Sequence, residues 1–218
     1  VLPFCPETCP ILAHPVSPSI GKAAMDHDEA DYSTADLAAL ARRIDRPVVL
    51  VGMMGTGKSS IGRRLASLLH LPFVDADEAI EQAAQLSISE IFERHGEAAF
   101  RDGERRVIAR LMDGNSASDR RKVIATGGGA FVNPETRALI LAKAVTVWLD
   151  ADIDTLVERT TRKDTRPLLR QGDPREILTR LRDERRPAYA EAPIHVTSGR
   201  GPQARTVARV LKEIDAWL

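Results

Sequence analysis

The chain has 218 residues, with 31 basic and 31 acidic side chains and a formal net charge of zero. A neutral chain lacks the broad positive field that attracts nucleic acid, and an aromatic content of 4% leaves few rings to stack on bases. No apolar run approaches the ~18 residues that a membrane span needs. We therefore expect one α/β domain that binds neither nucleic acid nor a membrane.

Residues 1–32 differ from the rest of the chain and are expected to form a flexible tail or an expression remnant. Prolines, which break helices and central strands, recur through them at Pro3, Pro6, Pro10, Pro15 and Pro18. These prolines also interrupt the apolar core that a secretory signal peptide requires. The folded domain is expected to span residues 33–218.

Both cysteines, Cys5 and Cys9, lie in this first segment. Their spacing allows half of a zinc site, but no second pair follows, so metal binding there is disfavoured. A domain without a disulfide framework suits a reducing compartment, and the sequence therefore predicts a cytoplasmic protein.

The first two predicted elements of the domain are a helix and a buried strand. Ser33 is a suitable N-cap for a helix that runs to Ile44 with one apolar face. Val48–Val51 is a continuous apolar run, as in a parallel strand that is buried on both faces.

A glycine-rich loop, Gly52–Ser59, follows this strand and matches the phosphate-binding pattern G-x-x-x-x-G-K-[ST]. Its glycines allow backbone N–H groups to surround phosphate oxygens. Lys58 supplies a positive charge for the outer phosphates, and Ser59 supplies a hydroxyl ligand for Mg²⁺. The next residues have helical apolar periodicity, and the N-terminus of that helix adds to the anion site. The alternative is a glycine-rich turn with a chance lysine.

The next predicted strand, which begins at Pro72, runs into two acids, Asp75 and Asp77. Residues two apart on an extended chain share a face. One acid could therefore hold Mg²⁺ through water, while the other accepts a proton from a hydroxyl or orients that hydroxyl. The alternative is a pair of solvent-facing acids that cap the next helix.

Helices and strands alternate through the rest of the chain. A capping box, Ser87–Glu90, opens a helix that Gly96 is expected to end. The later elements are a helix with Phe100, Val107, Ile108, Leu111 and Met112 on one side, a strand over 122–126, a helix opening at Asn133 and Pro134, a strand over 144–149, helices capped by Asp152 and Asp173, a strand over 194–197 and a closing helix through Val207, Val210, Leu211 and Ile214. This alternation predicts a parallel sheet covered on both faces, with ligands beyond the carboxyl ends of its strands.

Two motifs are candidates for binding a second substrate. Arg101 follows the apolar residue Phe100, and Glu104 lies one helical turn on, where it can pair with the arginine. Gly127–Gly129 follows a predicted strand and can bring backbone N–H groups against a polar ligand. The alternative for the glycines is a flexible turn.

From Arg159 to Arg186 the chain carries ten basic and five acidic side chains, although it is neutral overall. Most of these basic residues are expected on solvated helix faces. Residues from about 160 to 172 lack periodicity and are basic, which predicts a lid over a triphosphate and an anionic substrate.

As a set, these motifs resemble those of the shikimate kinase family over residues 47–218. The phosphate loop occurs in many kinases and nucleotidases, whereas the combination is specific. The motifs are, in order, Gly52-x-x-Gly55-x-Gly57-Lys58-Ser59, Asp75-Ala76-Asp77, Phe100-Arg101-x-x-Glu104, Gly127-Gly128-Gly129, Thr165-Arg166-Pro167-Leu168-Leu169 and Arg185-Arg186-Pro187-x-Tyr189. The resemblance implies a P-loop kinase of the nucleoside-monophosphate-kinase type, with a five-stranded parallel sheet in the order 2-3-1-4-5, helices on both faces and a mobile lid. It also implies transfer of the ATP γ-phosphate to the 3-hydroxyl of shikimate in the chorismate pathway.

The resemblance further implies a role for each residue of the acceptor site. Asp77 would hold the ring hydroxyls and accept the proton. Arg101 and Arg185 would bind the substrate carboxylate, because Arg185 rather than Arg186 has the family's spacing before Pro187. The residues that would line the ring are Gly127, Gly128 and Gly129.

The nucleotide side of the site is implied in the same way. Ser59 and Asp75 would hold Mg²⁺, and Lys58 and the lid residue Arg166 would neutralise charge on the phosphoryl group. Arg159 and Pro202 would flank the adenine. The full set of ATP-binding residues would be Gly52, Gly55, Thr56, Gly57, Lys58, Ser59, Ser60, Arg159, Arg166 and Pro202.

Two other functions remain open at this point. A gluconate kinase of the same fold also binds a hydroxy acid, so an arginine clamp alone does not exclude it. A nucleotide-binding regulatory module would need a degraded acceptor site, yet every acidic and basic candidate is present. We expect a monomeric enzyme that binds ATP and shikimate.

Overall fold

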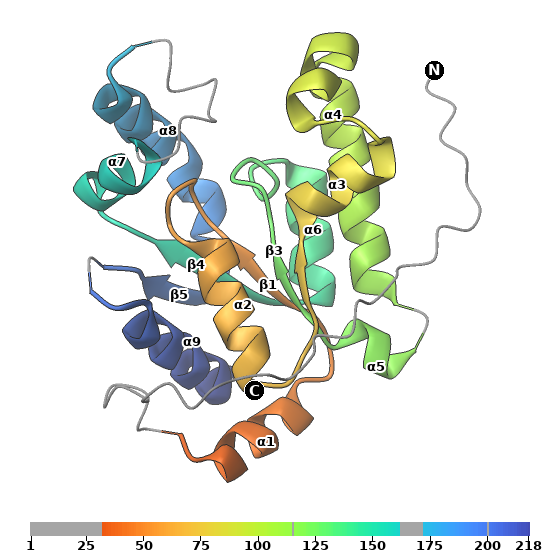
Figure 1. Cartoon of the computed structure of the whole chain (residues 1–218), viewed down its shortest axis with the longest axis vertical. Coiled ribbons are helices and arrows are strands. Elements are labelled where there is room, and N and C mark those ends of the chain that lie inside the picture. Colours follow the sequence, from red (N-terminus) through yellow and green to blue (C-terminus); the bar gives the residue numbers. More distant parts are fainter. Residues whose placement is uncertain (1–31, 115, 162–171, 200) are drawn as a thin grey trace.

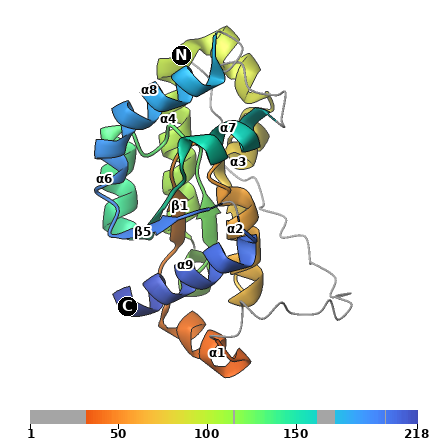
Figure 2. The ribbon, with the colours of Figure 1, turned by 90° about the vertical axis from the view of Figure 1, so that its left-hand side faces the viewer.

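A computed structural model describes residues 32–114, 116–161, 172–199 and 201–218 of the chain. A five-stranded sheet lies in the middle of this part of the molecule, with helices on both sides (Figures 1 and 2). In chain order the elements are α1 (Thr34–Arg43), β1 (Val48–Val51), α2 (Lys58–Leu68), β2 (Phe73–Asp75), α3 (Ala76–Ala84), α4 (Ile88–Asp113), α5 (Ala117–Arg120), β3 (Val123–Ala125), α6 (Pro134–Lys143), β4 (Val145–Asp150), α7 (Ile153–Thr161), α8 (Pro174–Tyr189), β5 (Ile194–Thr197) and α9 (Gln203–Trp217). None of these described helices has the length and hydropathy of a membrane span.

The strands lie in the order β2-β3-β1-β4-β5, and every neighbouring pair is parallel. The central strand β1 places Val48 opposite Val123 on one side and Val145 on the other. The order expected for the sheet is therefore confirmed. Because all strands run the same way, the loops after β1, β2 and β3 meet at one edge of the sheet, the upper edge in Figure 1.

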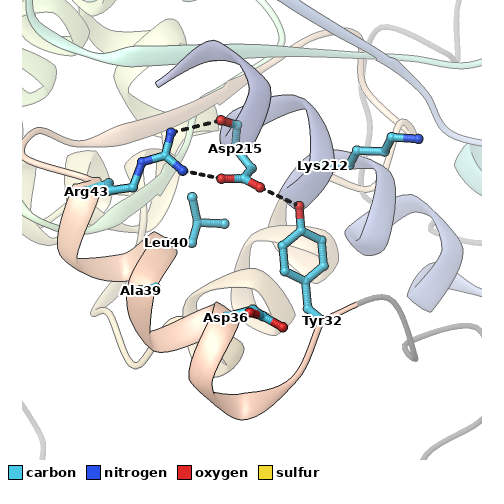
Figure 3. A pocket seen from close by; sticks show the side chains of 7 residues that line it. All are labelled: Tyr32, Asp36, Ala39, Leu40, Arg43, Lys212 and Asp215. Carbon is cyan, nitrogen blue, oxygen red and sulfur yellow. Dashed lines mark hydrogen bonds and ion pairs between the residues drawn. The ribbon is translucent and has the colours of Figure 1, made fainter.

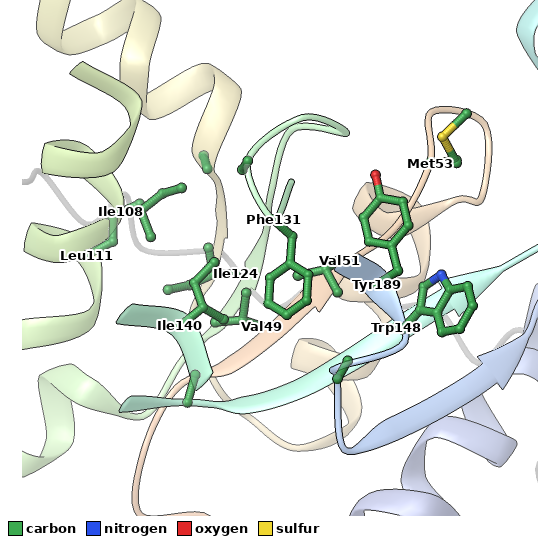
Figure 4. Packing of buried hydrophobic residues seen from close by; sticks show 14 of the residues in the cluster. Val49, Val51, Met53, Ile108, Leu111, Ile124, Phe131, Ile140, Trp148 and Tyr189 are labelled. Atoms are coloured by element: carbon green, nitrogen blue, oxygen red, sulfur yellow. The ribbon is translucent and has the colours of Figure 1, made fainter. Parts of the chain in front are cut away.

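The sheet is buried on both faces, which explains the continuous apolar sequence of β1. Val48 and Leu50 belong to the cluster that packs under α1, α2 and α9. Val49 and Val51 belong to the opposite cluster, with residues of α4, α6 and α8 (Figure 4). All four side chains are fully buried, so neither face of this strand tolerates a polar residue without an unpaired buried group.

Local signals in the sequence set most helix starts. Ser33 and Ser87 each form a reciprocal capping box, at the start of α1 and α4 respectively. The expectation that Gly96 ends the first helix and that a second helix follows is confirmed: Gly96 has non-helical angles, φ 76° and ψ 173°, so α4 consists of two helices that meet in a kink at this glycine. The short helix α5 was not expected from the sequence.

Helix α1 is attached to α9 by a polar cluster around Asp215 (Figure 3). The Arg43 guanidinium donates to the Asp215 carboxylate and, at 3.0 Å, to its backbone carbonyl oxygen. The Tyr32 hydroxyl donates to the same carboxylate at 3.3 Å, and Leu40 is buried beneath. Tyr32, which the sequence assigned to the tail, therefore contacts the domain. Residues 1–31 lie outside the described part of the chain, and their assignment as a tail stays a prediction.

Candidate active site

The phosphate loop between β1 and α2 has the backbone that its sequence predicts. Gly52, Gly55 and Gly57 have φ values of 136°, 85° and 94°, which favour glycine. A Cβ on Gly52 would in addition clash with the carbonyl oxygen of Leu149. Lys58 begins α2 and folds back over the loop, with Nζ 2.8 Å from the Gly52 oxygen. The loop thus presents a helix N-terminus and an ammonium group in one place, as an anion site requires.

Thr56 and Ser60 complete the loop sequence in different ways. Thr56 is fully buried, and its hydroxyl donates to the Met53 carbonyl at 2.9 Å. Ser60 is exposed on the first turn of α2. The side chain of Thr56 therefore stabilises the loop itself, and its backbone N–H bonds to the Met53 carbonyl at 3.4 Å.

Ser59 and Asp75 meet between α2 and β2. The Ser59 hydroxyl donates to the Asp75 carboxylate at 2.6 Å. The other carboxylate oxygen of Asp75 accepts from the Asp77 backbone N–H at 3.1 Å and caps α3. Asp75 thus does cap a helix, as one reading of the sequence predicted, but it also contacts the phosphate loop. A hydroxyl and a carboxylate side by side are the oxygen donors that Mg²⁺ accepts.

Asp77 projects from the first turn of α3 toward the triple-glycine loop. A Cβ on Gly127 would lie only 2.6 Å from Asp77 Oδ1. Burial raises the pKa of Asp77, and the charge of Asp75 raises it further, while Lys58 acts in the opposite direction. An acid with a raised pKa accepts a proton more readily than an ordinary aspartate does.

Arg101 reaches the same loop from α4. Its Nη1 lies 2.8 Å from the Glu104 carboxylate, and its Nη2 lies 3.3 Å from Glu97. A Cβ on Gly129 would lie 2.5 Å from Arg101 Nη2, so the guanidinium packs directly on that glycine. The pKa of Glu104 is raised by burial, although Arg101 lowers it in part. The sequence had paired these two residues, and the structure confirms the contact.

Helix α8 brings Arg185 to the middle glycine of the loop. Arg185 Nη1 donates to the Gly128 carbonyl oxygen at 3.2 Å, whereas Arg186 is exposed. The geometry therefore favours Arg185 over Arg186 as the residue that faces the loop. The hydroxyl of Tyr189, one turn further along α8, donates to the same carbonyl oxygen.

Arg159 links the phosphate loop to the segment after β5. It donates to the Gly199 carbonyl oxygen at 2.6 Å and to the Ser198 hydroxyl at 3.0 Å. Its Nη1 also lies 3.4 Å from the carbonyl oxygens of the phosphate loop at Gly55 and Thr56. Pro202 is the N-cap of α9 just beyond that segment. Arg166 and most of the predicted lid lie outside the described residues.

Two contacts at the site had no signal in the sequence analysis. Arg137 on α6 donates to the carbonyl oxygens of Phe131 at 3.2 Å and Val132 at 3.0 Å, and pairs with Glu191 at 3.0 Å. It thereby holds the end of the triple-glycine loop against the segment that follows α8. The second contact is that of the Tyr189 hydroxyl with the Gly128 carbonyl; Tyr189 was named in a family motif, but no role was assigned to it. Glu191 is distant from Arg137 in sequence, as Gly128 is from Tyr189, so only the fold could bring these partners together.

The central phosphate loop of a 2-3-1-4-5 parallel sheet defines this chain as a P-loop kinase. Comparison with known proteins narrows the class. A family model described as shikimate kinase matches residues 54–215. A shikimate kinase of Novosphingobium aromaticivorans is 62% identical over 194 residues, which cover 89% of this chain and all of that protein. One of Caulobacter vibrioides is 58% identical over 176 residues, covering 81% of this chain and 84% of that protein.

A solved structure agrees with the sequence relatives. Shikimate kinase from Acinetobacter baumannii, in complex with shikimate, superposes with a TM-score of 0.72 at 33% identity, over 81% of this chain and 97% of that one. The chain belongs to the shikimate kinase family, whose members transfer the γ-phosphate of ATP to the 3-hydroxyl of shikimate in aromatic amino acid biosynthesis. The resemblance inferred from the sequence motifs is confirmed.

Proposed function

We propose that this chain phosphorylates shikimate with the side chains gathered around the triple-glycine loop. The observation that carries the proposal is the approach of an acid and two arginines to three successive glycines: Asp77 at Gly127, Arg185 at Gly128 and Arg101 at Gly129. These residues come from three different helices. A ring that carries hydroxyl groups and a carboxylate suits this site, because the acid can accept from the hydroxyls and the arginines can bind the carboxylate.

Asp77 is the residue to accept the proton of the attacking hydroxyl. Its raised pKa supports this role, because the carboxylate competes better for the proton that the hydroxyl loses. Arg101 and Arg185 would bind the substrate carboxylate, since a planar guanidinium forms paired hydrogen bonds with it. Arg101 is held in place by Glu104, whose side chain is only 1% exposed.

Phosphoryl transfer depends chiefly on alignment and charge neutralisation. Lys58 supplies positive charge at the phosphate loop and would exchange its present contacts with backbone carbonyls for phosphate oxygens. Ser59 and Asp75 would hold Mg²⁺, which would neutralise phosphate charge when bound. Within the described ranges no group of three His, Cys, Asp or Glu residues could hold a metal by itself. Mg²⁺ shared with a nucleotide needs only one or two protein oxygens.

Further assignments from the sequence also remain predictions. Arg166 would lie on a lid at about 160–172, and Arg159 and Pro202 would flank the adenine. The protein would be a cytoplasmic monomer, and a single domain would follow a dispensable tail.

The experiment that tests the proposal is an ADP-release assay with shikimate, with gluconate, with nucleoside monophosphates and without acceptor. Release that depends on shikimate is expected. The control is Lys58→Ala, which should keep a native far-UV circular dichroism spectrum and lose most turnover. The substitution removes the positive charge that would face the transferring phosphate. Turnover with gluconate but not with shikimate would refute the acceptor site.

A further inference from the structure

Two hydrogen-bond donors from one helix converge on a single carbonyl oxygen in the acceptor site. The Tyr189 hydroxyl and Arg185 Nη1 both donate to the oxygen of Gly128. The two residues are four apart on α8 and therefore lie on one face of the helix, one above the other. A carbonyl oxygen has two lone pairs, so it can accept both bonds at once.

The two donor side chains differ in conformational freedom. The Tyr189 side chain is 1% exposed, and its ring lies against those of Trp148 and Phe131, with centroids 6.0 and 6.4 Å away (Figure 4). The packed rings fix the direction of the hydroxyl. Burial raises the pKa of Tyr189 to about 12, so the hydroxyl keeps its proton, and hence its donor, at neutral pH. Arg185 is only half-buried, and its guanidinium group is carried on a long, flexible side chain.

This difference matters when the carboxylate of the substrate arrives. Under the proposed function, the Arg185 guanidinium has to turn from the Gly128 carbonyl to the bound carboxylate. With Tyr189 in place, the carbonyl keeps one donor throughout. Without that hydroxyl, Arg185 is the remaining described donor to this oxygen, and its departure leaves a partly buried acceptor unpaired.

We propose that Tyr189 is a positioning residue that keeps the Gly128 carbonyl hydrogen-bonded and so releases Arg185 for the substrate carboxylate. This inference rests on the proposed function, in particular on the assignment of Arg185. The loop itself does not depend on Tyr189 alone, because Arg137 holds its far end at Phe131 and Val132. The loss of the hydroxyl should therefore affect substrate binding more than the fold.

The first test is Tyr189→Phe, which removes one oxygen and leaves the ring packing intact. The KM for shikimate should rise roughly five- to twentyfold, the lower part of the range for an unpaired acceptor because Gly128 is only partly buried. The KM for ATP and the kcat at saturating shikimate should stay within about twofold of wild type. Tyr32→Phe is the matched control, since it deletes a hydroxyl that bonds to Asp215 on α9, and it should leave every kinetic constant unchanged.

A double-mutant cycle with Arg185→Ala separates this inference from the proposed function. If Tyr189 acts by releasing Arg185, removing the hydroxyl should not raise the KM further in the Arg185→Ala background. If the two substitutions raise the KM for shikimate additively, the inference is overturned. It is also overturned if the KM rises in Arg185→Ala but stays unchanged in Tyr189→Phe. An unchanged KM in Arg185→Ala itself would instead overturn the assignment of Arg185 to the substrate carboxylate in the proposed function, and the inference with it.

Discussion

Gly129→Ala is the substitution that tests the acceptor site most directly. The backbone of Gly129 is not in the left-handed region, so alanine is compatible with the local conformation. Its Cβ, however, would lie 2.5 Å from Nη2 and 2.7 Å from Nη1 of Arg101. Real contacts of Cβ atoms are longer than this, so the guanidinium has to move. Arg101 is 24% exposed and can swing outward, which makes it the group that yields.

The expected loss can be worked out from the contacts that the guanidinium makes. A charge-assisted hydrogen bond contributes about 1.5–3 kcal/mol. Losing one such bond to the substrate carboxylate should raise the KM for shikimate roughly 10- to 100-fold. Displacement also weakens the Arg101 contact with Glu104, which is 1% exposed. A buried group left without a partner costs about 1–3 kcal/mol of stability, and the melting temperature should fall by several degrees.

The pH dependence of this stability loss has a definite sign. The pKa of Glu104 is already raised by burial, and Arg101 opposes that rise. Weakening Arg101 raises the folded-state pKa further above the unfolded value. Stability that depends on protonated Glu104 is present at acidic pH and is lost as pH rises through the folded-state pKa. The difference in melting temperature between wild type and Gly129→Ala should therefore shrink toward acidic pH.

Steady-state kinetics and thermal melts at several pH values are the assay. A KM for shikimate within twofold of wild type would show that Arg101 does not bind the substrate from its place on Gly129. Gly103→Ala is the matched control: it lies two residues from Arg101, inside α4, and a Cβ there would meet nothing within 4 Å. It should leave the KM unchanged.

Four further outcomes are expected. Gly103→Ala should raise stability by about 0.8–1 kcal/mol, because alanine is the better helix residue, and a thermal melt should show a gain of roughly 2–4 °C. Asp77→Asn should abolish turnover without lowering the melting temperature, because the raised pKa means that the charged form is disfavoured in the folded state. In the wild type, kcat should fall as pH falls through that raised pKa, at a pH above the ordinary aspartate value of about 3.9; a midpoint at or below 3.9 would contradict the role of Asp77. Arg185→Ala should raise the KM for shikimate at least tenfold, whereas Arg175→Ala, which removes an exposed pair with Asp154, should change it less than twofold in the same assay.

Much of this protein is determined by local sequence. Val48–Val51 has to be buried on both faces because it is continuously apolar, and the glycines after it allow the backbone that encloses a phosphate. The capping boxes at Ser33 and Ser87 start their helices through contacts three residues away. Such features need no distant partner, so they can be predicted from a short stretch of sequence.

The acceptor site depends on contacts that no short stretch contains. Gly128 receives hydrogen bonds from Arg185 and Tyr189, which follow it by 57 and 61 residues. The resemblance to a family assigned Arg185 rather than Arg186 to the acceptor site, and the structure adds the physical difference between them: Arg185 contacts the Gly128 carbonyl, whereas Arg186 is exposed on α8. The pKa of Asp77 is likewise raised by burial against the glycine loop rather than by its neighbours in sequence alone. These properties arise only when three helices converge on the carboxyl edge of a parallel sheet, because desolvation and hydrogen-bond direction depend on packing in three dimensions.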